Sequence, residues 1–218
     1  MIVRIDDSQM QRAITRLLEE TKREHSVVLR EQARGIVRRI IDLTPPANGK
    51  TKGGAAKKAG EATLRADIFK VFLPVKAGTA EHVPIAAEHA RWRGPNGRVR
   101  RGLAVDEKIR VNRNQLAEYL RQELRKVGWL AAGWNAAALA LRVPIPAWIS
   151  RHGTGHSTSS IKATASSIEI IMTNGTKFAG RARDLERRVK LAVQTQAAAL
   201  LRRMEHSTNK AAKSSGFK

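Results

Sequence analysis

The chain has 218 residues, with 41 Lys and Arg against 19 Asp and Glu, so its formal net charge is +22. It contains no cysteine, which excludes disulfides, thiolate metal ligands and cysteine nucleophiles. The excess positive charges repel one another in a compact state. We expect nucleic acid or acidic protein neighbours to balance them, and an anionic membrane surface is a weaker third choice.

The first predicted element is a long amphipathic helix from Ser8 to Leu43. Its apolar residues recur at intervals of three and four and include Met10, Ile14, Leu17, Leu18, Val28, Leu29, Ile36, Val37, Ile40 and Ile41. Ser8 and Gln11 fit a capping box, and the prolines of Thr44-Pro45-Pro46 end the helix because they lack an amide hydrogen. A straight helix of this length measures about 54 Å, so we expect it to bend or to project onto a neighbouring subunit.

The middle of the chain is predicted to contain little regular structure. The Gly and Lys content of residues 45–59 is typical of a flexible basic loop. A short amphipathic helix is predicted from Glu61 to Phe72. Residues 73–111 form an irregular insertion that contains a basic turn at residues 91–101. Long irregular segments of this kind are often functional or ordered by a partner.

Regular elements return after the insertion. Asn112 caps a helix that runs to Val127, and Gly128 breaks it. Residues 129–141 are apolar on nearly all sides, so they belong in a core or at an interface. Apolar and polar residues then alternate over 161–172, which predicts a β hairpin.

The last predicted element is a helix that begins near Arg181, and residues 206–218 are predicted to be a disordered basic tail. The order of elements predicts a single α+β domain over residues 1–205. The domain is mostly helical, with long N-terminal and C-terminal helices around a small antiparallel sheet that contains a β hairpin.

No group of residues forms a convincing catalytic, metal or cofactor site. Gly49-Lys50-Thr51 is like the end of a phosphate-binding loop, but the glycine that such a loop requires five positions earlier is Thr44. His152 and His156 lie in a glycine-rich loop without a third ligand beside them. We therefore expect a protein that is not an enzyme and needs no cofactor.

Two sets of residues are candidate interaction sites. The first is a subunit interface at Trp129, Trp134, Trp148, Leu17 and Leu18, because tryptophan often anchors interfaces; packing in the chain's own core is the alternative for the tryptophans. The second is the basic turn, whose Arg91, Arg93, Arg98, Arg100 and Arg101 suit phosphates or an acidic partner. Trp92 in this turn can stack on a base or anchor the turn to the body.

The order of several segments suggests a family. Leu43-Thr44-Pro45-Pro46 ends a helix, and Gly60-Glu61 opens another. Gly128-Trp129-Leu130-Ala131-Ala132-Gly133-Trp134, the hairpin, Asn174-Gly175-Thr176-Lys177-Phe178-Ala179 and a closing helix follow. This layout resembles the minor structural proteins of tailed-phage virions, especially tail-completion or neck proteins at the head–tail joint.

The resemblance implies a virion protein that is made in the host cytoplasm and has no membrane contact. It implies a homo-oligomer, commonly a hexameric ring, that contacts the connector on one side and the tail terminator or tail tube on the other. The family is structural, so it implies no catalytic residue. The charge leaves an alternative open, a basic nucleic-acid-binding protein that uses residues 91–101 and whose affinity falls steeply with salt.

Overall fold

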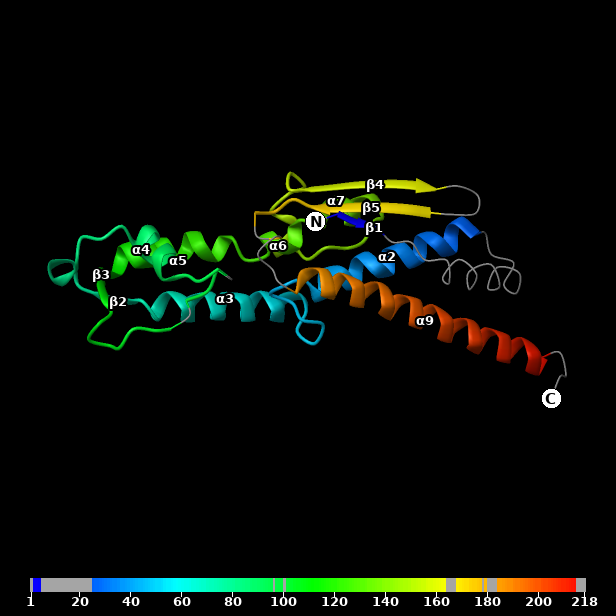
Figure 1. Ribbon diagram of the computed structural model, residues 1–218, viewed down its shortest axis with the longest axis horizontal. Helices are drawn as coiled ribbons and strands as arrows, with labels where there is room; N and C mark the ends of the chain where they lie inside the picture. The colour runs from blue at the N-terminus through cyan, green and yellow to red at the C-terminus, as the bar shows by residue number, and fades with distance from the viewer. Residues whose placement is uncertain are drawn as a thin grey trace.

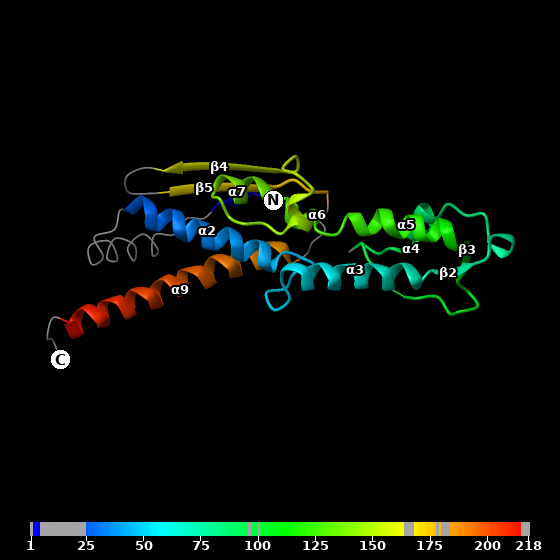
Figure 2. The same ribbon diagram turned by 180° about the vertical axis from the view of Figure 1, so that it is seen from behind.

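The structure is a computed structural model that describes residues 2–4, 25–95, 97–99, 101–163, 168–177, 179 and 184–214. It is α+β and mostly helical, as the sequence predicts. Figures 1 and 2 show an elongated molecule with two lobes. We call them the sheet lobe, which contains both ends of the described chain, and the helical lobe, which is formed by residues 53–125.

The sheet lobe is built on a three-stranded antiparallel sheet. Its strands are β1 (Ile2–Arg4), β4 (Ser157–Ala163) and β5 (Ile168–Asn174), in the order β1-β5-β4. β4 and β5 pair antiparallel, with Ser157 opposite Asn174, so the predicted hairpin is confirmed. Alternate residues of β5, among them Ile170 and Met172, are buried, as expected for a sheet with one covered face.

Two long helices pack side by side in this lobe. They are α2 (His25–Leu43) and α9 (Leu185–Ser214). α2 confirms the second half of the predicted N-terminal helix and ends before Pro45, while residues 8–24 lie outside the described residues. The tail predicted over 206–218 is wrong for residues 206–214, which continue α9 as helix, and residues 215–218 are not described.

Short helices complete the sheet lobe. They are α6 (Trp129–Ala132), α7 (Asn135–Ala140) and α8 (Ala147–Ser150). α7 packs against β4, and α2 contacts β5. Gly128 has a φ of +100° and divides α6 from the helix before it, so the predicted break is confirmed. None of the helices among the described residues is long and apolar enough to cross a membrane.

The helical lobe follows α2 in the chain. It comprises α3 (Gly53–Phe69), β2 (Phe72–Val75), the 3-10 helix η1 (Ala77–Thr79), α4 (Ile85–Trp92), β3 (Ile109–Asn112) and α5 (Arg113–Arg125). β2 and β3 form a two-stranded parallel sheet in which Phe72 lies opposite Ile109. The Asn112 side chain accepts a hydrogen bond from the Asn114 amide (2.8 Å), which confirms the predicted cap.

Two predictions for the middle of the chain are wrong in part. The loop predicted over 45–59 is helical from Gly53 onward, where α3 begins. The insertion predicted to be irregular over 73–111 contains η1, α4 and most of β2 and β3. These elements are regular because they surround a core of their own, formed by Ile68, Val71, Phe72, Val99, Val111, Leu116 and Leu120.

Among the described residues, the buried apolar side chains form two clusters, one centred in each lobe, and Ala56 in the first turn of α3 belongs to the cluster of the sheet lobe. Leu64 on α3 packs against both clusters, so the lobes are connected through the middle of α3. Gly60 on the same helix lies close to Pro46 and Val127, where a Cβ would approach the Pro46 ring to 2.7 Å. At Gly60 the waist between the lobes is therefore closely packed.

Candidate interaction surfaces

The three candidate interface tryptophans lie in different environments. Trp134 is 1% exposed, and its Nε1 donates a hydrogen bond to Thr44 Oγ1 (3.0 Å). Trp148 is also buried and packs against Gly128. The interface prediction is therefore wrong for these two, which belong to the chain's own core. Trp129 is only half-buried, and Leu17 and Leu18 lie outside the described residues.

Trp129 lies at the waist between the lobes, beside the loop that contains His152 and His156. Its ring is parallel to the His152 ring, with centroids 6.1 Å apart, and the centroid of His156 is 5.5 Å away. The two histidines therefore pack on an indole. Within the described residues, no three His, Asp or Glu side chains gather in a way that would hold a metal ion.

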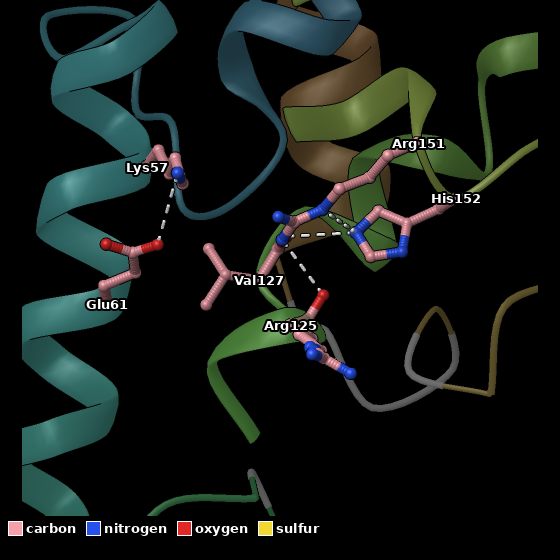
Figure 3. A network of polar contacts seen from close by, with 6 residues as sticks. All are labelled: Lys57, Glu61, Arg125, Val127, Arg151 and His152. Atoms are coloured by element: carbon pink, nitrogen blue, oxygen red, sulfur yellow. Dashed lines mark hydrogen bonds and ion pairs between the residues drawn. The ribbon is translucent and has the colours of Figure 1, made fainter. Parts of the chain in front are cut away.

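Arg151 joins the two lobes at this waist (Figure 3). Its Nη2 donates hydrogen bonds to the carbonyl oxygens of Arg125 (3.0 Å) and Val127 (3.1 Å). A ring nitrogen of His152 also lies 3.1 Å from the Val127 oxygen. The last carbonyls of a helix have no partner within the helix, so Arg151 of the sheet lobe satisfies the end of α5 in the helical lobe.

Replacing Arg151 with glutamine is expected to lower the free energy of unfolding by about 1 kcal/mol, because the α5 carbonyls lose a charged donor in a partly exposed position. Urea denaturation of the full chain measures the change. Arg187→Gln is the control, since this exposed arginine pairs only within its own helix region, with Asp184 (3.5 Å). Equal losses in both variants would argue against a role for Arg151 at the waist.

The four arginines of the basic turn that the structure describes lie in different environments. The turn is closed by an antiparallel bridge between Arg93 and Val99. Arg93 is largely covered and pairs with Glu123 on α5 (3.3 Å), and Arg91 lies 3.9 Å from Glu88. Arg98 and Arg101 are exposed, and Arg100 lies outside the described residues. The structure thus commits Arg93 to an internal ion pair, while Trp92 is 37% exposed beside it.

A buried polar network joins this turn to α4 and α5, and no periodicity or motif in the sequence indicates it. His89 on α4 is fully buried, and its Nδ1 lies 2.7 Å from the Tyr119 hydroxyl on α5. Burial, helped by the positive charge of Arg93, lowers the pKa of His89 to about 4. Burial and the charge of Glu123 raise the pKa of Tyr119 to about 12. At neutral pH both side chains of the pair are therefore uncharged.

Glu123 completes the network. Burial by itself raises the pKa of its carboxyl, but hydrogen bonds and charge from Lys126 and Arg93 outweigh that effect and lower the pKa below the usual 4.5. The carboxylate therefore stays ionised and ties α5 to the basic turn. Its contribution to stability is lost only as the pH falls below that usual value.

Stability is expected to fall between pH 6.5 and pH 4 because of His89. In this pH range His89 binds a proton in the unfolded chain but stays neutral in the folded chain, so unfolding becomes more favourable as the pH drops. The expected loss is about 2 kcal/mol at pH 5 and about 3 kcal/mol in full. Urea denaturation at pH 7 and pH 5 measures it, with His89→Phe as the comparison. Equal losses in both proteins would refute the assignment to His89.

An open groove of about 970 Å³ runs between the lobes. It is bordered by Leu64 and Asp67 on α3, by the basic turn, by Trp129 and Leu130, and by the start of α9 at Leu185. The half-buried Trp129 therefore faces a concave surface that both lobes form. Comparison of the chain with known protein families, with curated proteins and with solved structures finds no match.

Proposed function

We propose that the chain is a non-catalytic structural subunit of a tailed-phage virion. In this proposal it is a tail-completion or neck protein that forms a ring and joins the head connector to the tail. The elongated, two-lobed shape carries the argument. The described elements form two lobes with a core in each rather than one compact body (Figures 1 and 2). An elongated subunit offers more surface to neighbours than a compact monomer of the same mass.

The α9 helix adds to this elongation. Among its residues whose side chains are described, Leu185, Val189 and Ala192 are buried, and Gln196 still packs against Gly35 of α2. Toward its C-terminal end the helix diverges from α2 and runs past the other described elements, as Figures 1 and 2 show. In the sequence, Leu200 and Met204 follow Val189 at helical spacing. An apolar repeat of this kind in a long helix suits docking onto a second copy, and a head-to-tail contact generates rings.

The charge supports the same proposal. A net charge of +22 on an elongated subunit steers it toward acidic neighbours and fixes its orientation there. The two lobes offer separate surfaces, so one can contact copies of the chain while the other contacts the connector or the tail. The partners proposed are therefore other virion proteins.

The test compares phage particles that are produced with the unchanged chain, without the chain, and with a variant chain. Particles that carry the double variant Leu200→Asp and Met204→Asp are expected to appear as separate heads and tails in electron micrographs, while the purified variant keeps its melting temperature. Arg202→Asp, on an exposed position of the same helix, is the control and is expected to give joined particles. Absence of the chain from purified tailed particles by mass spectrometry would overturn the proposal.

The alternative function, nucleic-acid binding, has one specific observation in its favour. Trp92 is 37% exposed beside Arg91, whose side chain is 78% exposed. Stacking on a base together with phosphate contacts would use such a pair. Binding of the full chain to DNA at 150 mM salt that is lost in the variant with Trp92→Ala and Arg101→Gln would favour this function; unchanged binding would count against it.

A further inference from the structure

A second concave surface, which we call the basic groove, lies in the sheet lobe beside α2. It has a volume of about 770 Å³ and is formed by α2, by the loop that precedes α3, by residues 142–144 and by the middle of α9. Its cationic lining residues are Arg34, Arg38, Arg39, Lys52 and Arg142. The acidic ones are Glu31 and Asp42, so positive charge is in excess.

Two of the arginines are held in place by the fold. Arg34 Nε donates a hydrogen bond to the carbonyl oxygen of Leu141 (2.7 Å), which fixes its guanidinium at the end of α7. Arg142 follows directly and has a φ of +54°. A left-handed backbone costs a residue other than glycine about 1 kcal/mol. The backbone strain at Arg142 thus occurs where the fold brings this arginine to the rim of the groove.

Charge is not balanced among the described residues that line the groove. Five cationic side chains face two acidic ones, and one of these, Asp42, pairs with Lys52 (3.2 Å). Arg39 Nε is buried, and no acceptor for it is found among the described residues. Buried donors nearly always have an acceptor in a finished structure. The arginines of the groove therefore have donor capacity that the described part of the chain does not fill.

The shape and lining favour one class of ligand. None of the described residues that line the groove is aromatic, so they offer nothing on which a nucleic-acid base could stack. A concave site of this volume takes small groups or a short extended segment, whereas a DNA duplex is too wide to enter it. The amides of Gln32 and Gln196 and the hydroxyl of Thr195 also line it and can bond a peptide backbone. Arginine pairs bidentately with carboxylates.

We propose that the basic groove binds an acidic segment of a partner protein, with Asp or Glu carboxylates on Arg38, Arg39 and Arg142. That this partner is a neighbouring virion protein rests on the function proposed above. The binding chemistry depends on the groove alone.

The test uses the full chain and fluorescein-labelled hexapeptides, measured by fluorescence anisotropy at 150 mM salt. A peptide of alternating Asp and Glu is expected to bind, and its Asn/Gln counterpart is not. Arg38→Gln combined with Arg142→Gln is expected to weaken binding at least tenfold. Arg65→Gln combined with Arg113→Gln removes the same charge from exposed positions of the helical lobe and is expected to change it less than twofold.

Three results would overturn the inference: equal binding by both double variants, displacement of the peptide by millimolar inorganic phosphate, or a loss of duplex DNA binding specific to the groove variant. Circular dichroism of each variant confirms that the fold is kept. The two proposals fail separately. If the chain binds the peptide but is absent from tailed particles, the groove proposal stands and the virion function is refuted. If particles are joined but the chain does not bind the peptide, the virion function stands and the groove proposal is refuted.

Discussion

The Trp134→Ala variant is expected to lose about 3–5 kcal/mol of stability, the largest effect of any single substitution considered for this chain. Trp134 is 1% exposed in the core of the sheet lobe. Its removal leaves a cavity between α2 and α7 and deprives Thr44 Oγ1 of the hydrogen bond that the indole donates (3.0 Å). Thr44 Oγ1 itself donates to the Ile40 carbonyl (2.7 Å), so the end of α2 is disturbed as well.

Urea denaturation followed by circular dichroism measures this loss. Trp92→Ala is the matched control, because it deletes the same side chain from a surface where it is 37% exposed. The control is expected to cost about 1 kcal/mol or less. Similar losses at the two positions would contradict the assignment of Trp134 to the core.

The Gly128→Ala variant is expected to lose about 2–4 kcal/mol, from left-handed strain and overpacking together. Gly128 has a φ of +100° between α5 and α6. An added Cβ would lie 2.7 Å from Cε3 and 2.7 Å from the backbone oxygen of Trp148. Since a backbone atom is involved, relief requires α8 to move, and with it Arg151, which follows α8 and holds the end of α5.

Gly54→Ala is the control for this substitution. Gly54 lies in the first turn of α3, and a Cβ there meets nothing within 4 Å. Alanine is a better helix former than glycine by about 1 kcal/mol, so this variant is expected to be neutral or slightly more stable. If alanine at Gly54 lowered the stability as much as alanine at Gly128, the effect at Gly128 would not be specific to the waist.

The elements that could be predicted are those whose boundaries are set locally. Proline after Thr44 ends α2, Asn112 caps α5 with its own side chain, and Gly128 separates α5 from α6. The hairpin could also be predicted, because one face of β4 and β5 is buried and apolar and polar residues alternate along the two strands.

The elements that were missed depend on contacts distant in the chain. β2 and β3 are short, β2 contains Pro74, and they form strands only because Phe72 and Ile109 meet in the second core. The buried network around His89 likewise joins α4 to α5 and leaves no periodic trace in the sequence. The start of α3 was missed because its glycines and lysines have the composition of a linker, although they extend a helix whose later turns are packed.

The length of α9 gives the molecule a lever. Its 30 residues measure about 45 Å, and its first turns pack on the body. A rotation of about 5° at that end would move the far end sideways by about 4 Å, a little less than the 5.4 Å rise of one helical turn. A slight adjustment inside the sheet lobe would thus be magnified into a shift of several ångströms where the tip meets a neighbour.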